Sequence, residues 1–418
     1  MNKMLTKHIF SLLCTIALFV ACFANSGCRL YTEGNMSEVN ALSSKTEMKP
    51  FDHLENPLVF TMPVRKELFL FGNTSDEYPI HETVGGIYVV YDTTTESVYD
   101  WAFCEGRNFT YGNNYCAPVA NGLFYAEVFQ DGTLDETGRW FNRLVRLDTT
   151  TGKIAAYKIS SFPFFDYDAS INKYYISLKD DAHYGPDGNT FINSDYTITL
   201  RDTTSLEDKS FSFTVDAQYI SYNYNDTMYI ICTMGENTYL KRLSDDGNSL
   251  INLLDLGKNE AGMQYNILDI SENYVFINKY LYSSENDTNN WDFQKKLIYN
   301  ISQPEKPPVE ITNENTNNKV KKYEYGTNFV YKNKYYLLQT GYTSDYKIIL
   351  YQSDIENIIF EKIVEIDETL YQFKKIGSKI YFWYENSNDI PIYYLDLDTL
   401  EFKKSGVISK SQMLEDLK

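Results

Sequence analysis

The sequence predicts an all-β fold built from one repeated unit of antiparallel strands. Short runs of alternating apolar and polar residues recur along most of the 418 residues, and the 37 Tyr and 25 Phe favour pleated, half-buried strands. The motif Asp-Thr-Thr-Thr also ends an apolar run at Asp92 and again at Asp148. A strand, a polar turn and a second strand in this order predict a β-hairpin.

Polar turns of this kind recur along the whole chain at similar spacing. Between the first and the last, they follow one another on average about every 51 residues, near Asp92, Asp148, Asp202, Asp245, Ser302, Asp354 and Asp398. The side chains of Asp and Thr cap backbone N–H groups in tight turns. The Asp-Thr-Thr motif therefore has a structural explanation that needs no chemistry.

An aromatic strand precedes each turn. These strands begin at residues 67, 122, 173, 228, 273, 334 and 379. A further apolar strand in front, such as residues 217–223, gives each unit room for four strands. A lone sheet of four short strands leaves its faces exposed, whereas many such sheets stacked around an axis cover one another.

This pattern resembles the β-propellers, and the resemblance covers roughly 350 residues of the chain. It is most similar to exported bacterial propeller proteins whose blades carry Leu-Asp and a following Thr-Gly at such a turn, represented here by Leu147, Asp148 and Gly152. The resemblance implies a single propeller over residues 57–408 with seven four-stranded blades, six or eight being the alternatives. Two stacked β-sandwich domains would also contain short strands, but they give no reason for seven similar hairpins.

The N-terminus has the order of an export signal. Lys3 and Lys7 precede an apolar stretch, Ile9 to Ala21, that is shorter than the roughly 20 residues of a membrane-spanning helix. Phe19-Val20-Ala21-Cys22 resembles the lipobox of bacterial lipoproteins. The resemblance implies a signal peptide over residues 1–21 and lipid on Cys22, with Cys28 as the alternative. Cleavage after Ala24 without lipid, or an uncleaved anchor, are the other interpretations.

Export and lipidation would make this a cell-envelope protein anchored in a membrane, facing the periplasm or the cell surface. Residues 22–56 are polar and Ser-rich, which predicts a flexible tether between membrane and propeller, and residues 409–418 are predicted as a C-terminal tail. An oxidising compartment would allow Cys104 and Cys116 to form a disulfide. Cys232, in an apolar run, is predicted to be a buried small hydrophobe.

The charge balance narrows the classes of partner. The chain carries 57 Asp and Glu against 38 Lys and Arg, a formal net charge of -19. A surface of this sign repels phosphate backbones, so nucleic acid is not an expected partner. An envelope protein or a carbohydrate is the expected kind of ligand.

One polar segment stands out as a candidate binding loop. Residues 179–195 gather Asp180, Asp181, His183 and Asp187, whose oxygens suit Ca²⁺, although their spacing follows no known calcium loop. Otherwise no cofactor is expected, and motifs for nucleophilic catalysis or nucleotide binding are absent from the sequence.

The sequence therefore favours a non-catalytic scaffold that binds a ligand or a protein. The alternative is a hydrolase or lyase acting on polysaccharides with carboxylates at the propeller axis, which requires several carboxylates in one pocket. A purely structural envelope subunit, with a broad exposed apolar patch, is a third interpretation.

Overall fold

Within the residues that the computed structural model describes, the strands form seven four-stranded antiparallel sheets. The described residues are 31–32, 45–70, 80–105, 119–120, 123–134, 140–159, 168–171, 174–202, 207–225, 227–260, 262–283, 290–314, 316, 319–344, 346–370, 372–384 and 389–417.

Each sheet takes its four strands from one continuous part of the chain. The first contains β1 (Tyr31–Thr32), β2 (Leu58–Leu70), β3 (Ile80–Asp92) and β4 (Ser97–Glu105), and the second contains β5 (Val119–Ala120), β6 (Leu123–Leu134), β7 (Trp140–Asp148) and β8 (Ile154–Ile159). The third contains β9 (Asp168–Ile171), β10 (Tyr174–Tyr184), β11 (Phe191–Asp202) and β12 (Asp208–Val215), and the fourth contains β13 (Ser221–Asn225), β14 (Thr227–Met234), β15 (Asn237–Leu243) and β16 (Leu250–Lys258).

The remaining sheets follow the same order. The fifth contains β17 (Met263–Ser271), β18 (Tyr274–Ser283), β19 (Asn290–Asn300) and β20 (Val309–Ile311), and the sixth contains β21 (Thr327–Tyr331), β22 (Lys334–Gln339), β23 (Ile348–Asp354) and β24 (Glu361–Ile366). The seventh contains β25 (Gln372–Ile376), β26 (Lys379–Trp383), β27 (Asp389–Asp396) and β28 (Phe402–Ser409). Two 3₁₀ turns, η1 (Val320–Tyr323) and η2 (Gly341–Ser344), and the short helix α3 (Lys410–Asp416) complete the described elements.

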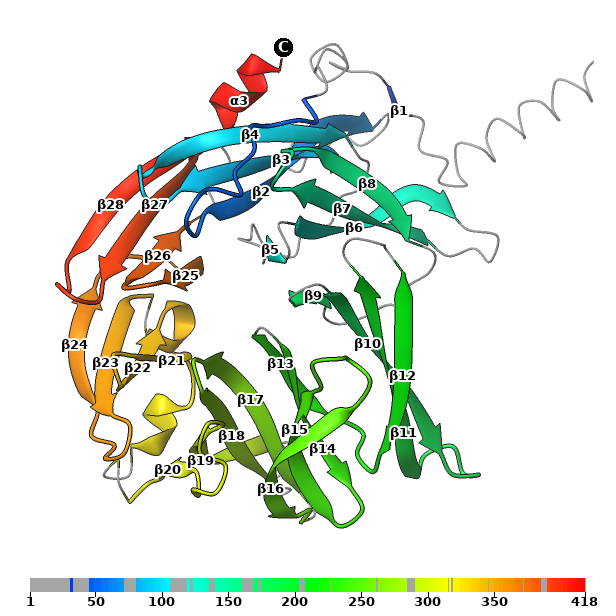
Figure 1. The fold of residues 1–418 in the computed structure, drawn as a ribbon, viewed down its shortest axis with the longest axis vertical. Coiled ribbons are helices and arrows are strands. Elements are labelled where there is room, and N and C mark those ends of the chain that lie inside the picture. Colours follow the sequence, from blue (N-terminus) through cyan, green and yellow to red (C-terminus); the bar gives the residue numbers. More distant parts are fainter. Residues whose placement is uncertain are drawn as a thin grey trace, which may run out of the picture.

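The sheets follow one another around a common axis, which makes the architecture a β-propeller (Figure 1). Successive first strands β5, β9, β13, β17 and β21 contact one another near this axis. The last sheet returns to lie beside the first, so the ring brings the two ends of the described chain together.

The seven predicted turns join the third and fourth strands of the seven sheets. At the first turn, Asp92 Oδ1 accepts a hydrogen bond from the N–H of Thr94 at 2.8 Å, and Oδ2 accepts one from the Thr95 hydroxyl at 2.8 Å. At the second, Asp148 Oδ1 accepts from the N–H of Thr150 at 2.9 Å. The prediction that these residues cap turns is confirmed.

The aromatic strands are the second strands of the sheets, and β14, β22 and β26, whose side chains are described throughout, are largely buried because neighbouring sheets cover both of their faces. In β14, the six residues between its two ends are all buried, whereas the third strand β15 alternates. Aromatic rings pack between sheets, as in Phe60 against Trp383, whose ring centroids lie 5.2 Å apart, and Phe276 against Tyr335 at 5.3 Å. The core therefore lies between the sheets, as the sequence predicted.

No described sheet combines strands from the two ends of the chain, since each takes its four strands from one continuous part. Contacts between side chains of the first and last sheets therefore close the ring. One hydrophobic cluster joins Phe60 and Val89 of the first sheet to Trp383 and Ile392 of the last. Polar contacts support it: the hydroxyls of Tyr91 and Ser405 lie 2.8 Å apart, and Lys379 Nζ lies 3.2 Å from a carboxylate oxygen of Glu96.

Residues 45–52, here called the strap, bind the outer strands of the first two sheets to each other. The Phe103 N–H of β4 donates to the Lys45 carbonyl at 2.7 Å, and the Ile154 N–H of β8 donates to the Thr46 carbonyl at 2.9 Å. Met48 and Phe51 are buried, with 6% and 1% of their surface exposed. The segment predicted as a flexible tether therefore differs in its last part, because these two apolar side chains find a place between the sheets.

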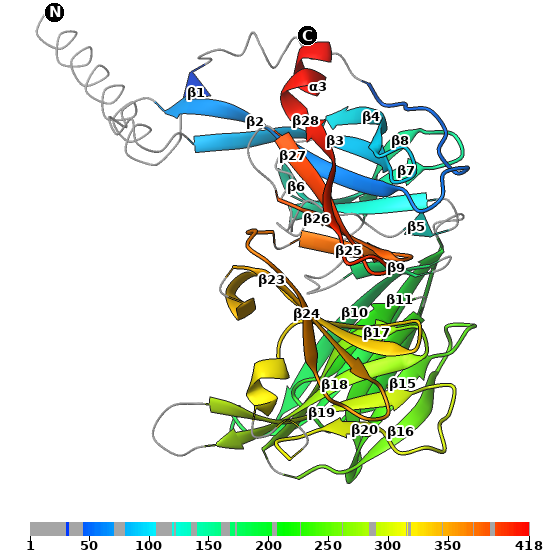
Figure 2. The same ribbon diagram turned by 90° about the vertical axis from the view of Figure 1, so that its left-hand side faces the viewer.

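The C-terminal residues also pack onto the propeller rather than forming a free tail. Helix α3 follows β28 at one end of the last sheet and contacts β27 (Figure 2). Its Met413 and the following Leu417 are 5% and 1% exposed and belong to the cluster that closes the ring. Among the described residues, no helix has the length and apolar character that crossing a membrane requires.

Candidate functional site

Alternating strand directions divide the loops between the two faces of the ring. The turns between third and fourth strands lie on one face. The connectors from a fourth strand to the next first strand lie on the other, together with the hairpins between second and third strands. We call this second face the connector face. Loops held by a rigid scaffold are common positions for binding residues.

The connector of residues 216–220, between β12 and β13, is fixed at its start by hydrogen bonds. The Asp216 N–H donates to the Thr233 carbonyl at 2.9 Å, and the Asp216 carboxylate accepts from the Gly235 N–H at 2.8 Å. Ile220 is buried at its end, whereas Gln218 and Tyr219 between these anchors are exposed, with 57% of the surface of Tyr219 open to solvent. The connector thus presents an exposed aromatic ring on a backbone anchored at both ends.

Next to this connector, hydrogen bonds at a β-bulge in β17 join the fourth and fifth sheets. The pairing of β17 with β18 skips Leu268, which bends the strand. Ser221 Oγ accepts from the Ile267 N–H at 2.6 Å, and Asn223 Nδ2 donates to the Leu268 carbonyl at 2.8 Å. The edges of β13 and β17 are therefore held together by side-chain to backbone hydrogen bonds.

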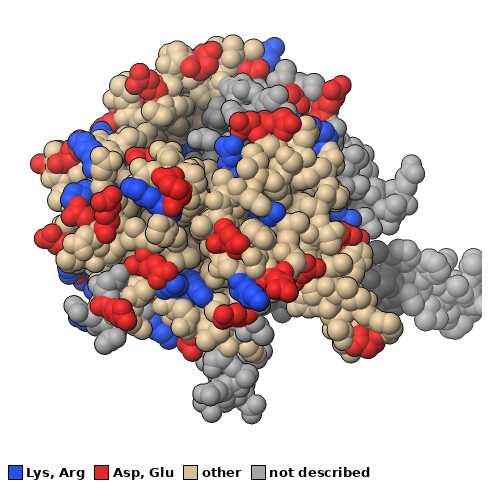
Figure 3. All heavy atoms as spheres, turned by 60° about the horizontal axis from the view of Figure 1, so that its bottom comes forward, with Lys and Arg blue, Asp and Glu red and all other residues tan. Residues whose placement is uncertain are grey.

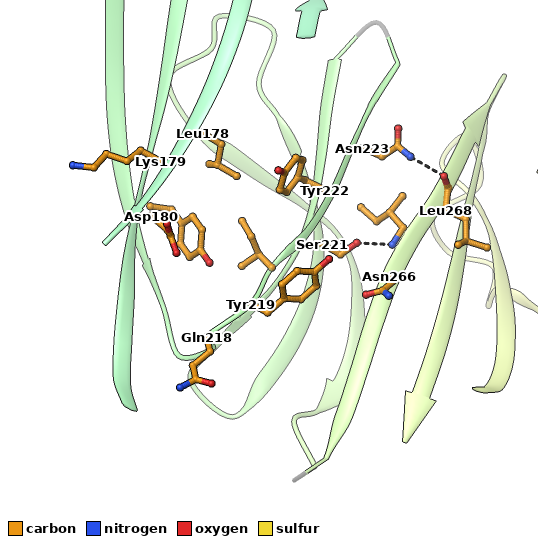
Figure 4. Close-up of a pocket in the computed structure, with 13 residues that line it drawn as sticks. Leu178, Lys179, Asp180, Gln218, Tyr219, Ser221, Tyr222, Asn223, Asn266 and Leu268 are labelled. Atoms are coloured by element: carbon orange, nitrogen blue, oxygen red, sulfur yellow. Dashed lines mark hydrogen bonds between the residues drawn. The ribbon is translucent and has the colours of Figure 1, made fainter. Parts of the chain in front are cut away.

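A cavity of about 550 Å³ lies among the third, fourth and fifth sheets (Figure 4). Lys179 and Asp180 of β10 form one wall, and Asn266 and Leu268 of β17 lie on the opposite side, with Tyr219 between them. The complete described lining is Leu178, Lys179, Asp180, Tyr196, Gln218, Tyr219, Ile220, Ser221, Tyr222, Asn223, Asn266, Ile267 and Leu268. Its size falls within the range of about 300–1,000 Å³ common for small-molecule sites.

Two polar groups of this cavity are unusual. Asn266 Oδ1 is buried and has no hydrogen-bond partner among the residues that the structure describes. A buried acceptor without a partner costs about 1–3 kcal/mol, so it is seldom retained without a compensating role. Burial, and after it the nearby carboxylate of Asp180, raise the pKa of Tyr196 to about 12, so the phenol is a neutral hydrogen-bonding group.

A second cavity of about 660 Å³ adjoins the first and shares Gln218, Tyr219 and Ser221 with it. It also reaches Cys232, which is 2% exposed. Burial raises the pKa of the Cys232 thiol to about 11, so the sulfur remains an unreactive thiol, and the prediction of a buried hydrophobe is confirmed.

The structure separates the four residues of the predicted binding loop. Asp180, Asp181 and His183 lie on strand β10 rather than in a loop, because the β10–β11 pairing extends to Tyr184 and Phe191. Asp180 faces the first cavity, and His183 Nε2 lies 2.9 Å from Asp195 Oδ2. Only Asp187 lies in the hairpin turn, where its carboxylate accepts from the N–H groups of Asn189 and Thr190 at 3.2 and 3.0 Å.

Among the described residues, no three His, Cys, Asp or Glu side chains are grouped in a way that would hold a metal ion. In the described lining of the two cavities, Asp180 is the carboxylate of the first and Asp216 that of the second. Hydrolysis of a glycosidic bond ordinarily uses a pair of carboxylates flanking the bond.

Several predicted sites lie outside the described residues. These include the signal peptide with Cys22, the alternative Cys28, and Cys116 of the predicted disulfide. Cys104 lies in β4, opposite Gly86 of β3.

A buried polar cluster joins the fifth and sixth sheets at Lys296, which is 0% exposed. Lys296 Nζ donates to the Tyr323 carbonyl and to Asn328 Oδ1, both at 2.7 Å, and Asn328 Nδ2 donates to the Asp269 carboxylate at 2.8 Å. Burial lowers the pKa of Lys296 to about 7 and raises that of Asp269. Because Lys296 has no exposed surface, the cluster acts as a joint between sheets rather than as a binding site.

The charged residues on the face turned toward the viewer in Figure 3 are mixed in sign. Asp and Glu stand among Lys and Arg rather than forming a single field, so this face does not select a ligand by charge alone.

Sequence reasoning missed Tyr219 and Asn266. Residues 217–223 were predicted to be one strand, because apolar and polar residues alternate there. In fact β13 begins only at Ser221, which leaves Tyr219 on the connector. The unpartnered oxygen of Asn266 depends on the bulge at Leu268 and on β13, and no local pattern signals it.

No protein-family model matches the chain, and no curated protein resembles it in sequence. Solved structures do resemble it in fold. An acylaminoacyl peptidase from Pyrococcus horikoshii matches with a TM-score of 0.47 and 11% identity over 87% of this chain, which spans about half of that protein, 54% of its length.

Two further structures match over nearly their whole length. The β-propeller domain of the Trilobed protease from Pyrococcus furiosus, described as having an open velcro topology, has a TM-score of 0.45 and 11% identity, covering 87% of this chain and 98% of that one. A putative 6-phosphogluconolactonase from Bacteroides fragilis has a TM-score of 0.43 and 9% identity, covering 85% and 96%. At these identities the comparisons concern the fold and assign neither a family nor an activity.

Proposed function

We propose that this protein is an exported, lipid-anchored β-propeller of seven blades that binds a ligand on its connector face without catalysing a reaction. The observation that carries the proposal is the cavity beside Tyr219, where an exposed aromatic ring on an anchored connector lies near the buried, unpartnered oxygen of Asn266. The seven described sheets support the blade number, and the lipobox-like sequence before Cys22 supports the anchor.

A binding role is favoured over hydrolysis or lysis of a polysaccharide. The described lining of each cavity contributes one carboxylate, and Asp180 and Asp216 line different cavities. A stacking surface with hydrogen-bonding groups suits recognition, whereas glycoside cleavage needs an acid and a base or nucleophile on opposite sides of one bond.

The site can be tested before the ligand is known. Immobilised wild-type protein, Tyr219→Ala and Tyr325→Ala are exposed to envelope extract, and the retained material is analysed by protein mass spectrometry and by sugar analysis after acid hydrolysis. Tyr325 is a matched control, because it is 55% exposed against 57% for Tyr219 and does not line either cavity. We expect one component to be retained by the wild type and the control and lost with Tyr219→Ala. Equal retention by all three would contradict the site.

The same assay covers the calcium prediction. Adding Ca²⁺ should increase retention, and Asp180→Asn should remove the increase, if the carboxylates of β10 hold the ion. Retention that is unchanged by Ca²⁺ and by chelator would exclude a calcium-dependent site.

The anchor is tested by cell fractionation. Cys22→Ser should move the protein from the membrane fraction to the soluble fraction, whereas Cys28→Ser should leave it membrane-bound. Membrane partitioning of the Cys22→Ser/Cys28→Ser double variant would contradict the lipoprotein proposal.

A further inference from the structure

The surface that the first cavity offers to a ligand is aromatic and hydrogen-bonding rather than aliphatic. Three of its four described aliphatic residues, Leu178, Ile220 and Ile267, are 8%, 3% and 7% exposed and belong to the packed core, and the fourth, Leu268, is half-buried. Tyr219 is 57% exposed, and Gln218 beside it is exposed as well. A ligand therefore meets a ring face and amide groups and finds no deep pocket for an apolar side chain.

A ligand that donates a hydrogen bond would satisfy the side-chain oxygen of Asn266 in the first cavity. Asn266 Oδ1 accepts no hydrogen bond from the residues that the structure describes, whereas the neighbouring Ser221 Oγ already accepts the Ile267 N–H at 2.6 Å. Asn266 is half-buried and lines the cavity but its Oδ1 is buried, so a ligand hydroxyl reaches this oxygen only after the side-chain amide turns toward the cavity. Because an unsatisfied buried oxygen is costly, the hydrogen bond formed then gains more than the same hydroxyl would gain at an exposed amide.

The charges of the lining point to a neutral ligand. Lys179 and Asp180 stand side by side in sequence, both are exposed, and no Arg belongs to the described lining. Because these two exposed residues carry opposite charges, the described lining has no excess of either sign that would hold an anion or a cation.

We propose that the two adjoining cavities bind a neutral oligosaccharide, with the Tyr219 ring as a stacking surface and Asn266 Oδ1 as an acceptor for a sugar hydroxyl. Pyranose rings combine apolar C–H faces with many hydroxyl groups, which matches an aromatic ring with amides around it. This inference rests on the proposed binding function and specifies its ligand class.

An extended peptide fits the same geometry less well. Peptides commonly bind by adding a strand to a free sheet edge, and here β13 and β17 are already joined through Ser221 and Asn223. Leu178, Ile220 and Ile267 of the first cavity are also too buried to receive a peptide side chain, which leaves the half-buried Leu268 as the remaining aliphatic residue of the described lining.

The position of Tyr219 predicts a ligand longer than one sugar. Cavities of about 550 and 660 Å³ share Gln218, Tyr219 and Ser221 as a common border. A chain that crosses the Tyr219 ring enters both, so affinity should rise with chain length from the monosaccharide to the hexasaccharide.

The experiment is isothermal titration of the purified protein, from which the signal peptide has been removed, with neutral hexasaccharides. The panel contains maltohexaose, cellohexaose, xylohexaose, mannohexaose and galactohexaose, with the monosaccharides and hexagalacturonate alongside. We expect at least one neutral hexasaccharide to bind more tightly than its monosaccharide and than hexagalacturonate. Tyr219→Ala and Asn266→Leu should each weaken this binding about five- to tenfold, and Tyr325→Ala should leave it unchanged.

The possible failures are distinguishable. No binding by any neutral hexasaccharide, tighter binding of hexagalacturonate, or equal binding by Tyr219→Ala, with folding of each variant verified by circular dichroism, would overturn the oligosaccharide inference. If the envelope extract meanwhile yields a protein whose retention depends on Tyr219, the binding function stands and only the ligand class is wrong. Mass spectrometry of the recovered sugars decides catalysis, because shortened chains would overturn the non-catalytic function itself.

Discussion

Lys296 shows how hydrogen bonds stabilise an ionisable side chain that is buried between two sheets. Its stem crosses from the fifth to the sixth sheet, and its ammonium group is surrounded by the Tyr323 carbonyl and Asn328 Oδ1. Tyr335 donates to the same Asn328 oxygen at 2.7 Å, and Asn328 Nδ2 also donates to the Gly326 carbonyl at 3.0 Å, so the Asn328 side chain bonds four residues and links two sheets. Hydrogen bonds replace part of the lost solvation, but the pKa of Lys296 still falls to about 7.

This lowered pKa predicts a specific dependence of stability on pH. Between about pH 7 and the ordinary value of 10.5, the unfolded chain holds a proton on Lys296 that the folded chain has lost. The free energy of unfolding of the wild type, relative to Lys296→Met, should therefore rise with pH through this window. Urea unfolding from pH 7 to 10 measures it.

Two controls isolate the lysine. Burial raises the pKa of Asp269, which contributes with the opposite sign, since stability falls as pH rises through the titration of that carboxyl from its ordinary 3.8 upward. The comparison is therefore repeated in an Asp269→Asn background, where the lysine alone titrates. Lys258→Met, at a side chain 76% exposed, serves as the surface control for the loss of a lysine. A difference between wild type and Lys296→Met that stays flat from pH 7 to 10 would contradict the lowered pKa.

The strap depends on contacts with residues distant in sequence, Phe103 of β4 and the β7–β8 turn. Gly152 at the β7–β8 turn has φ +70°, and a Cβ there would lie 1.9 Å from the Met48 carbonyl oxygen. Gly235 has φ +64° with no atom within 4 Å of such a Cβ. A side chain at either position would be strained by the positive φ, but only a side chain at position 152 would also collide with the strap.

Gly152→Ala should consequently destabilise the protein more than Gly235→Ala. Displacing the strap exposes Met48 and Phe51, each worth about 1.5–3 kcal/mol of burial, so we expect a difference of about 2–4 kcal/mol in the free energy of unfolding. Hydrogen exchange should also accelerate at the Phe103 and Ile154 amides, which donate to the strap. Equal losses in the two variants would mean that the strap contributes no stability.

The contrast between turns and strap explains what the sequence could predict at this scale. Asp92 and Asp148 cap residues two or three positions away, so the signal and its effect lie in the same short segment. Met48 and Phe51 are isolated apolar residues in a polar segment, and their partners Val90 and Leu147 come from two different sheets. The same limit applies to the site, since Asp180, Tyr219 and Asn266 lie on three sheets or their connectors and meet only when the ring forms.

At the scale of the whole molecule, the repeated four-stranded sheets account for the fold. We expect the contacts that close the ring between the first and last sheets to make its unfolding cooperative. Each described sheet takes its strands from one part of the chain, so the ring is held by the hydrophobic clusters between sheets, with hydrogen bonds from the strap and from side chains such as Ser221 beside them. The cluster between the last and first sheets joins residues more than 300 positions apart, such as Phe60 and Trp383. The hydrogen-bonded hydroxyls of Tyr91 and Ser405, 314 positions apart in sequence, join the same two sheets. Contacts of this range are absent from any local pattern, which is why the order of strands was predictable and the means of closure was not.

Trp383 provides the test of this closure. It is 2% exposed, and its ring meets that of Phe60 edge to face across the boundary between the last and first sheets. Trp383→Ala should lower the free energy of unfolding by about 3–5 kcal/mol, because it leaves a cavity where the ring closes. Ile359→Ala, at a side chain 69% exposed, should change it by less than about 0.5 kcal/mol.

If the boundary is what makes the ring unfold as one unit, Trp383→Ala should also separate the denaturant transitions seen by far-ultraviolet circular dichroism and by tryptophan fluorescence. A single coincident transition with a loss below about 1 kcal/mol would place the cooperative unit elsewhere in the propeller.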